Sequence, residues 1–153
     1  MRRILIIGSG GREHAIAWAL RNTSSEPFEI YCAPGNAGIA QAARIIDISV
    51  NDTSGLADFA RAENIDLTFV GPEAPLAAGL VDRFAETGLR IVGPGSAAAR
   101  LEASKSFAKD FMARHQIPTA AYRLGESPQQ AIEFLRSGVF GAAESAVVVK
   151  ADG

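Results

Sequence analysis

Cysteine is nearly absent from the sequence, since Cys32 is the only one among 153 residues. A single cysteine excludes an intrachain disulfide and a zinc site built from several cysteines, and a lone thiol is typical of a reducing compartment. An excess of positive charge is also missing, because 15 Lys and Arg residues stand against 17 Asp and Glu residues. Without basic residues in excess to displace counterions from phosphates, we expect no nucleic-acid partner.

Long hydrophobic runs are missing as well. No apolar run approaches the ~20 residues of a membrane-spanning helix. The run that follows Arg2 and Arg3 ends at Gly8, which is short of the roughly 7–15 residues in the core of a signal peptide. We therefore predict a cytoplasmic protein with no membrane partner. With 48% hydrophobic and 21% charged residues, the composition is that of a folded globular chain and not of a disordered one.

Short apolar runs alternate with helical patterns through the first 93 residues. The runs predict strands at Arg3–Gly8, Glu29–Cys32, Arg44–Ile48, Asp66–Val70 and Leu89–Val92. The patterns between them predict helices at Arg12–Leu20, from Asp52 or Thr53 to Glu63, and at Leu76–Glu86. Such alternation requires crossover connections and favours a parallel sheet covered on both faces. We predict an α/β protein whose N-terminal domain, residues 1–102, is an open, Rossmann-like parallel sheet.

The last third of the sequence has a different pattern. It predicts helices at about Ser104–Gln116 and from Ser127-Pro128 to Arg136, and strands at Ala121–Leu124 and Val147–Lys150. A sheet of two strands is marginal by itself. We interpret residues 103–153 as the beginning of a second, α+β domain that is incomplete here, and we expect the chain to be a fragment of a longer protein.

The first predicted strand is followed by a glycine-rich turn, Gly8–His14. Ligands of open parallel sheets bind at strand carboxyl ends, and a helix N-terminus offers free N–H groups to an anion. The turn is not a dinucleotide fingerprint, because Glu13 replaces the third glycine and Cys32 and Ala33 replace the expected acid. Arg12 opposes the helix dipole unless a phosphate compensates it. A tight turn with a solvated Arg12 is the alternative.

Two further strand ends are rich in Gly and Pro. The segment Pro34–Gly38 is typical of a plain turn when its residues are taken alone. In Gly71–Pro75, the carboxylate of Glu73 lies between two prolines, where it can accept hydrogen bonds from sugar hydroxyls or an amine. An exposed glutamate in a rigid turn explains the same residues equally well.

Three lysines in the last third are candidates for phosphate contacts. Lys105 and Lys109 lie one helical turn apart, and a solvated helix face is the usual explanation of such a pair. Lys150 follows Ala146–Val149, which we expect to be a strand buried on both faces. A lysine at the end of such a strand is expected to point into a cleft or at a partner, and contacts to phosphate would stabilise it there.

Taken together, the sequences of these loops indicate a family far more specifically than any one of them does alone. The segments are Ile6–Ala15, Pro34–Gly38, Val70–Leu76, Leu101–Lys109, Ile117–Ala120 and Val148–Gly153. In this order they closely resemble the opening of the phosphoribosylamine–glycine ligases, also called glycinamide ribonucleotide synthetases. The resemblance spans the whole chain with no departure at a motif position, although the family continues well beyond this length. It implies a pre-ATP-grasp N-terminal domain followed by the start of an ATP-grasp domain.

The resemblance implies an ATP-dependent ligase of purine biosynthesis. ATP and glycine would form glycyl phosphate, and the amine of 5-phosphoribosylamine would attack it to give glycinamide ribonucleotide, ADP and phosphate. The family's ligands for Mg²⁺ or Mn²⁺ would lie beyond Gly153, so no metal site and no catalytic residue are assigned here. We expect a monomer, and no ligase activity from residues 1–153 alone.

The resemblance also assigns residues to ligands. Gly10, Gly11 and Arg12 would bind the substrate phosphate, with Glu13 shaping that loop. Asn36 and Glu73 would face the ribose or the amine, and Lys105 and Lys150 would face the ATP phosphates and the adenine side. Whether Lys105 or Lys109 faces the nucleotide depends on the phase of the helix.

Two alternatives belong to other classes. One is a nicotinamide-dinucleotide-binding oxidoreductase domain, which rests on the same glycine-rich turn. The other is a non-catalytic nucleotide-binding module.

Overall fold

The structure is a computed structural model that describes residues 1–141 and 146–152. The chain divides into two compact units, Met1–Ala99 and Arg100–Gly153, and each is described by itself. Gly153, which ends the last of the segments above, lies outside the described residues, as do residues 142–145 of the predicted second domain. Among the described residues, no helix combines the length and apolar character that a membrane span requires.

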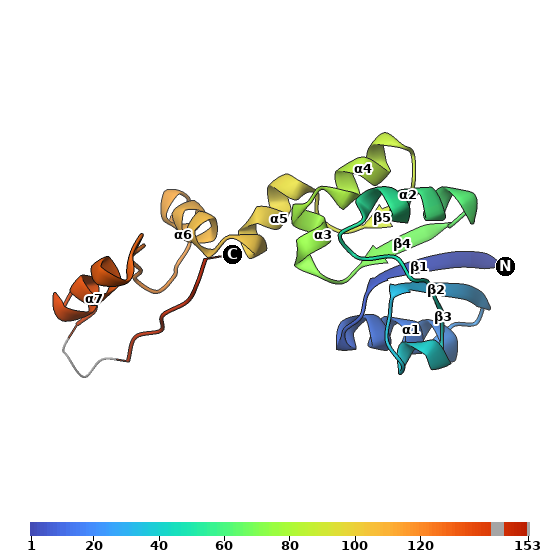
Figure 1. The fold of residues 1–153 in the computed structure, drawn as a ribbon, viewed down its shortest axis with the longest axis horizontal. Coiled ribbons are helices and arrows are strands. Elements are labelled where there is room, and N and C mark those ends of the chain that lie inside the picture. The colour runs from blue at the N-terminus through green and yellow to red at the C-terminus, as the bar shows by residue number, and fades with distance from the viewer. Residues whose placement is uncertain (142–145, 153) are drawn as a thin grey trace. The chain divides into compact units, whose positions relative to one another are not determined.

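The first unit is built on a sheet of five parallel strands in the order β3-β2-β1-β4-β5 (Figure 1). The strands are β1 (Arg2–Gly8), β2 (Phe28–Pro34), β3 (Arg44–Ile45), β4 (Leu67–Val70) and β5 (Ile91–Val92). The central strand β1 pairs with β2 on one side and with β4 on the other. From β1 the chain adds β2 and β3 on one side and then crosses to add β4 and β5 on the other. The boundary between β1 and β4 is therefore a topological switch point, where an open α/β sheet binds its ligands.

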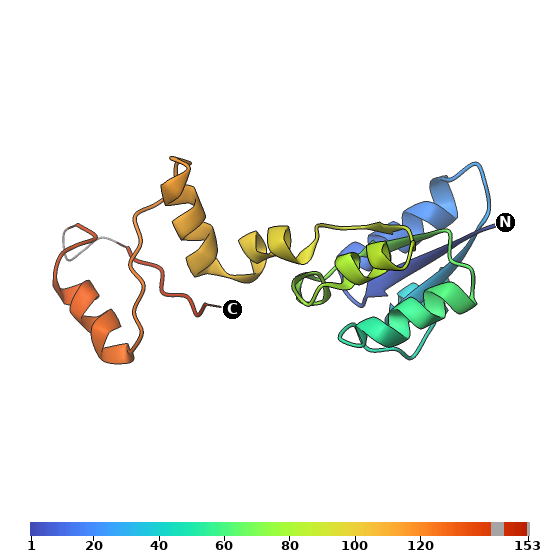
Figure 2. The ribbon, with the colours of Figure 1, turned by 90° about the horizontal axis from the view of Figure 1, so that it is seen from above.

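Helices cover both faces of this sheet (Figures 1 and 2). One face carries α1 (Gly11–Thr23) and the short helix η1 (Ile39–Gln41). The other face carries α2 (Thr53–Ala62) and α4 (Leu80–Glu86). The predicted α/β fold with an open parallel sheet is confirmed.

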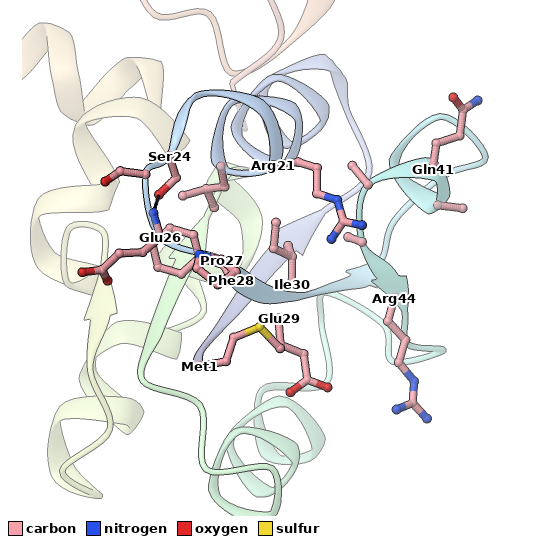
Figure 3. Close-up of a pocket in the computed structure, with 15 residues that line it drawn as sticks. Met1, Arg21, Ser24, Glu26, Pro27, Phe28, Glu29, Ile30, Gln41 and Arg44 are labelled. Atoms are coloured by element: carbon pink, nitrogen blue, oxygen red, sulfur yellow. Dashed lines mark hydrogen bonds between the residues drawn. The ribbon is translucent and has the colours of Figure 1, made fainter.

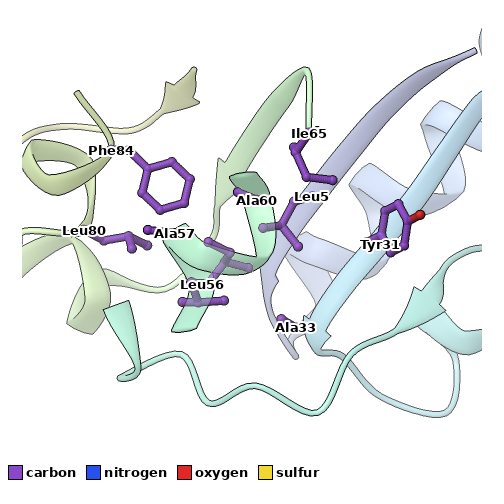
Figure 4. Close-up of a cluster of buried hydrophobic side chains, with 10 residues drawn as sticks. Leu5, Tyr31, Ala33, Leu56, Ala57, Ala60, Ile65, Leu80 and Phe84 are labelled. Carbon is purple, nitrogen blue, oxygen red and sulfur yellow. The ribbon is translucent and has the colours of Figure 1, made fainter. Parts of the chain in front are cut away.

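The core lies in two layers because successive residues of β1 point to opposite faces. Ile4 and Ile6 pack against α1, whereas Leu5 and Ile7 join a cluster that includes Tyr31 of β2 and Phe84 of α4 (Figure 4). Each large side chain buried in this way contributes about 1.5–3 kcal/mol of transfer free energy. Ile4–Ile7 of β1 are at most 4% exposed, which makes the central strand a rigid base for the loop that follows it.

Several predicted elements were wrong in detail. The helix predicted at Leu76–Glu86 is two helices, α3 (Glu73–Ala77) and α4, because Gly79 between them has a φ of 84°. The strand predicted at Arg44–Ile48 pairs with β2 only through Arg44 and Ile45. Helix α5 (Ser96–Ala103) was not predicted, although a run of alanine at its start has high helix propensity.

The second unit holds α6 (Lys105–Arg114) and α7 (Pro128–Arg136), both close to their predicted positions. The strands predicted at Ala121–Leu124 and Val147–Lys150 were wrong, because both segments are irregular. A strand needs a neighbour to complete its hydrogen bonds, and the described residues of this unit form no ladder with either segment. Val148 and Val149 are 77% and 73% exposed, so the burial expected around Lys150 is not observed.

Candidate functional site

The loops after β1, β2 and β4 are connected by backbone hydrogen bonds at the carboxyl ends of the strands. The N–H of Gly35 donates to the carbonyl of Gly8 at 3.1 Å, and the N–H of Gly71 donates to the carbonyl of Ile7 at 3.0 Å. The three predicted segments therefore lie together, at the switch point between β1 and β4. This is the position at which a parallel sheet of this order binds its ligand.

Helix α1 begins in the first of these loops. Gly10 is its N-cap residue, with extended backbone angles, and Gly11 is its first helical residue. The first N–H groups of a helix have no acceptor within it, and together with the helix dipole they favour an anion. A Cβ added at Gly11 would meet nothing within 4 Å, so the backbone is open to a ligand at this point.

Glu13 fills the space beneath these loops. The residue is 3% exposed, and its Oε2 accepts a hydrogen bond from the N–H of Gly10 at 2.5 Å. A Cβ at Gly8 or Gly71 would overlap its carboxyl group, whereas one at Gly10 would lie 3.0 Å from its Oε2. The absence of a side chain at Gly8 and Gly71 therefore leaves the room that Glu13 occupies. Within the described residues, Oε1 of Glu13 is buried without a hydrogen-bond partner. Glu13 therefore joins the first turn of α1 to the loop after β4.

Arg12 and Glu73 face each other across the two loops. Nη2 of Arg12 lies 3.9 Å from Oε2 of Glu73, and the side chains are 67% and 53% exposed. An exposed ion pair at this distance contributes at most about 1 kcal/mol to stability. Both side chains are thus free to turn toward a ligand that carries an anion at one end and a donor at the other.

Asn36 ties the loop after β2 to the loop after β1. Its Nδ2 donates to the carbonyl of Ser9 at 2.7 Å, and its Oδ1 accepts from the N–H of Ile39 at 2.9 Å. The side chain is exposed, and the amide keeps one further N–H and one lone pair for a ligand. The family resemblance assigned Asn36 to the substrate, but neither of these two contacts was predicted.

The candidate lysines lie in the second unit. Nζ of Lys109 donates to Oγ1 of Thr119 at 2.7 Å and to the carbonyl of Ala120 at 3.1 Å. Lys105 begins α6 and is exposed. Among residues 1–141 and 146–152, neither Lys105 nor Lys150 lies within ion-pair distance of a carboxylate. Because the ammonium of Lys109 is held by its own unit, Lys105 is the better candidate for a ligand.

Lys150 borders a cleft of about 580 Å³ in the second unit, together with Tyr122, Phe140 and Val147. This volume is within the range of small-molecule sites. The lining combines apolar side chains with three cations, Lys109, Arg123 and Lys150. Within the described part of the chain, no group of three or more His, Cys, Asp or Glu side chains is arranged to hold a metal ion.

A groove of about 680 Å³ lies elsewhere on the first unit (Figure 3). It is lined by the last turn of α1 near Arg21, by the start of β2 at Phe28–Ile30, and by Arg44 of β3. The β2 residues among them belong to the amino-terminal half of that strand. The groove is therefore remote from the strand carboxyl ends, and none of the predicted site residues lines it.

The fold and these loops define a class: a Rossmann-like α/β domain with an anion-favouring helix terminus at its switch point. Residues 2–102 match the family model described as "Phosphoribosylglycinamide synthetase, N domain", and residues 103–153 match the ATP-grasp (A) domain of the same synthetase. The chain belongs to the phosphoribosylglycinamide synthetase family.

Curated relatives carry the name phosphoribosylamine–glycine ligase. One from Clostridium acetobutylicum is 47% identical over 151 residues, covering 99% of this chain and 35% of the relative. One from Vibrio parahaemolyticus is 53% identical over 154 residues, covering 99% and 34%. The chain thus spans about a third of the length of these relatives. The crystal structure of phosphoribosylamine–glycine ligase from Thermotoga maritima is 28% identical with a TM-score of 0.60, and covers 88% of this chain and 30% of that one.

The family resemblance seen in the sequence is confirmed by these matches. The oxidoreductase alternative loses its support, since the match runs through the glycine-rich turn and the last residues of β2 are Cys32, Ala33 and Pro34, with no acid among them. A dinucleotide site needs an acid near that strand end to bind the ribose.

Proposed function

We propose that this chain carries the phosphoribosyl-substrate platform and the first part of the ATP site of a ligase that joins glycine to 5-phosphoribosylamine. ATP and glycine form glycyl phosphate, and the amine attacks its carbonyl carbon to give glycinamide ribonucleotide, ADP and phosphate. The names of the relatives support this activity. The observation that carries it is the pairing of Arg12 with Glu73 beside the N-terminus of α1.

The phosphate of the substrate binds at the start of α1. The free N–H groups of Gly11 and Arg12 and the guanidinium of Arg12 supply donors and positive charge. Glu13 shapes this loop from below through its contact with Gly10. A phosphate bound there stabilises Arg12 at a position where the helix dipole otherwise opposes a cation.

Glu73 and Asn36 bind the other end of the substrate. The carboxylate of Glu73 accepts hydrogen bonds from a ribose hydroxyl or the amine, which fits its exposed position opposite Arg12. Asn36 offers its remaining donor and acceptor next to Ser9. Holding the ribosyl substrate at both ends fixes the amine for attack, and such positioning lowers the barrier of a two-substrate reaction.

Lys105 and Lys150 bind the nucleotide, toward the ATP phosphates and the adenine side. The exposure of Lys105 and the cleft beside Lys150 support this role. Mg²⁺ or Mn²⁺ neutralises the phosphate oxygens when it is bound. We expect its ligands beyond Gly153, and none of the described residues is assigned to it.

The boundary between the two domains lies at residues 102 and 103. The two family models meet there, and the compact units divide nearby, after Ala99. We place the protein in the cytoplasm as a monomer with no nucleic-acid or membrane partner. Its balanced charge and single cysteine support this placement.

Turnover by the full-length protein tests the proposal. The expected result is ADP formation that requires both glycine and 5-phosphoribosylamine, generated from ribose 5-phosphate and ammonia. ADP formation without either substrate, or none with both, would contradict it. Residues 1–153 alone are expected to form no ADP with glycine.

A further inference from the structure

The segment after Lys150 folds back onto the start of α6. Oδ1 of Asp152 accepts hydrogen bonds from the N–H of Lys105 at 2.7 Å and the N–H of Ser106 at 3.1 Å. Oδ2 accepts a third from the hydroxyl of Ser106. These contacts join residues 46 and 47 positions apart, and they fix one segment of the unit against another.

The three contacts complete the end of the helix. The hydroxyl of Ser104 accepts the N–H of Phe107 at 3.2 Å, so Ser104 and Asp152 together satisfy the first three N–H groups of α6. The hydroxyl of Ser106 and the backbone N–H groups hold the pKa of the Asp152 carboxyl below its usual range. The carboxylate is therefore charged at neutral pH, in the form that a helix N-terminus favours.

The contacts also determine how far apart the backbones of Lys105 and Lys150, the two lysines assigned to the nucleotide, lie. Asp152 bonds to the backbone of Lys105 itself, and Lys150 is two residues before Asp152 in sequence. Two residues of chain span at most about 7 Å, so Lys150 leaves the backbone close to the first turn of α6. Without the contact, nothing else among the described residues bonds residues 146–152 to α6.

We propose that Asp152 is a positioning residue that sets the spacing between Lys105 and Lys150 for the phosphates of the nucleotide. The proposal rests on the function proposed above. In this role Asp152 does not touch the nucleotide, because both of its carboxylate oxygens are bonded to α6. Asp152 holds the segment that carries Lys150, and Lys105 and Lys150 contact the phosphates of the nucleotide.

The test compares ATP affinity in variants of the full-length protein, measured by calorimetry. In Asp152→Ala we expect the Kd for ATP to rise about fivefold to tenfold, as for the loss of a charge-assisted contact. Asp152→Asn keeps an oxygen that accepts both backbone N–H groups, and we expect it to recover most of the affinity. Ser106→Ala loses only the hydroxyl contact, and an intermediate Kd is expected.

Asp82→Ala is the matched control. The carboxylate of Asp82 accepts the N–H of Ser96 at 2.9 Å at the start of α5, and Ser96 likewise lowers its pKa. This contact likewise joins a carboxylate to a backbone N–H at the start of a helix, but it holds no segment that carries a lysine assigned to ATP. We expect the Kd for ATP to stay at the wild-type value in this variant.

The outcomes separate the two proposals. A wild-type Kd in folded Asp152→Ala, or equal rises in Asp152→Ala and Asp82→Ala, overturns the positioning role. ATP binding by the wild type without glycine-dependent turnover overturns the proposed function and leaves the affinity comparison valid. If Asp152→Ala does not fold, the graded Kd values of Asp152→Asn and Ser106→Ala decide. No ATP binding by the wild type overturns both proposals.

Discussion

The carboxyl group of Glu13 occupies the space that a side chain at Gly71 would need. This relationship joins the first turn of α1 to the loop after β4, and both loops supply residues to the candidate site. Because Glu13 is buried, it cannot move aside without disturbing the packing around it.

Gly71→Ala tests this relationship. The added methyl group would overlap Glu13, and overpacking of this kind costs about 1–3 kcal/mol of the free energy of unfolding. In a Glu13→Ala background the space is free, so we expect the same substitution to cost much less. Urea unfolding of the four proteins of this cycle measures the coupling. Strictly additive losses would contradict the contact.

Gly11→Ala is the control for that cycle. Gly11 has open space around its Cβ position and is the first residue of α1. Replacing a helical glycine with alanine stabilises by about 0.4–1 kcal/mol where no strain arises. A large loss of stability in this control would show that the glycine-rich turn tolerates no side chain at all.

Asn36→Ala should destabilise the chain by about 1–2 kcal/mol, because it leaves the N–H of Ile39 and the carbonyl of Ser9 without their partner. Thermal unfolding checks this, with the exposed Asn51→Ala as a control expected to lie within about 0.5 kcal/mol of wild type. Equal melting temperatures for Asn36→Ala and Asn51→Ala would show that the amide does not hold the two loops together.

The burial of the Cys32 thiol predicts that the free energy of unfolding falls at high pH. Burial, and then the charge of Glu13, raise the pKa of its thiol from 9.0 to about 12. The unfolded chain therefore releases this proton first as the pH rises. The folded state should lose about 1.4 kcal/mol per pH unit between pH 9 and 12 from this group, with nothing lost below pH 9.

Urea unfolding across this pH range measures the slope. Cys32→Ala lacks the thiol, so its slope should be smaller by about that amount, although Tyr31, whose pKa burial also raises, still contributes. Identical slopes for the wild type and Cys32→Ala would contradict the burial of the thiol. The same burial predicts that thiol reagents modify Cys32 only after unfolding.

Much of the first unit could be predicted because its strands read as continuous apolar runs between helical patterns. The apolar run within Arg3–Gly8 predicted a strand, and a parallel sheet followed from the alternation of strands with helices. The limits were local. Gly79 breaks the predicted helix at a left-handed residue, and β3 is shortened to Arg44 and Ile45. Neither is visible in hydrophobic periodicity.

The site was predictable in residue types but not in contacts. Gly10, Arg12 and Glu73 were expected from their place after strands. The contact between Glu13 and Gly71 joins residues that are 58 positions apart in the sequence. The hydrogen bond between Asp152 and Lys105 joins residues that are 47 positions apart. Val147–Val149 had strand composition but no partner strand among the described residues. Composition alone does not supply such partners.

In the proposed function, the start of α1 binds the phosphate of the ribosyl substrate. The most direct test of this binding is calorimetric titration of the full-length protein with ribose 5-phosphate, comparing Arg12→Ala with Arg21→Ala at the other end of the same helix. We predict an affinity about 10- to 100-fold weaker in Arg12→Ala and unchanged in Arg21→Ala. Wild-type affinity in Arg12→Ala would show that the phosphate does not bind at the start of α1.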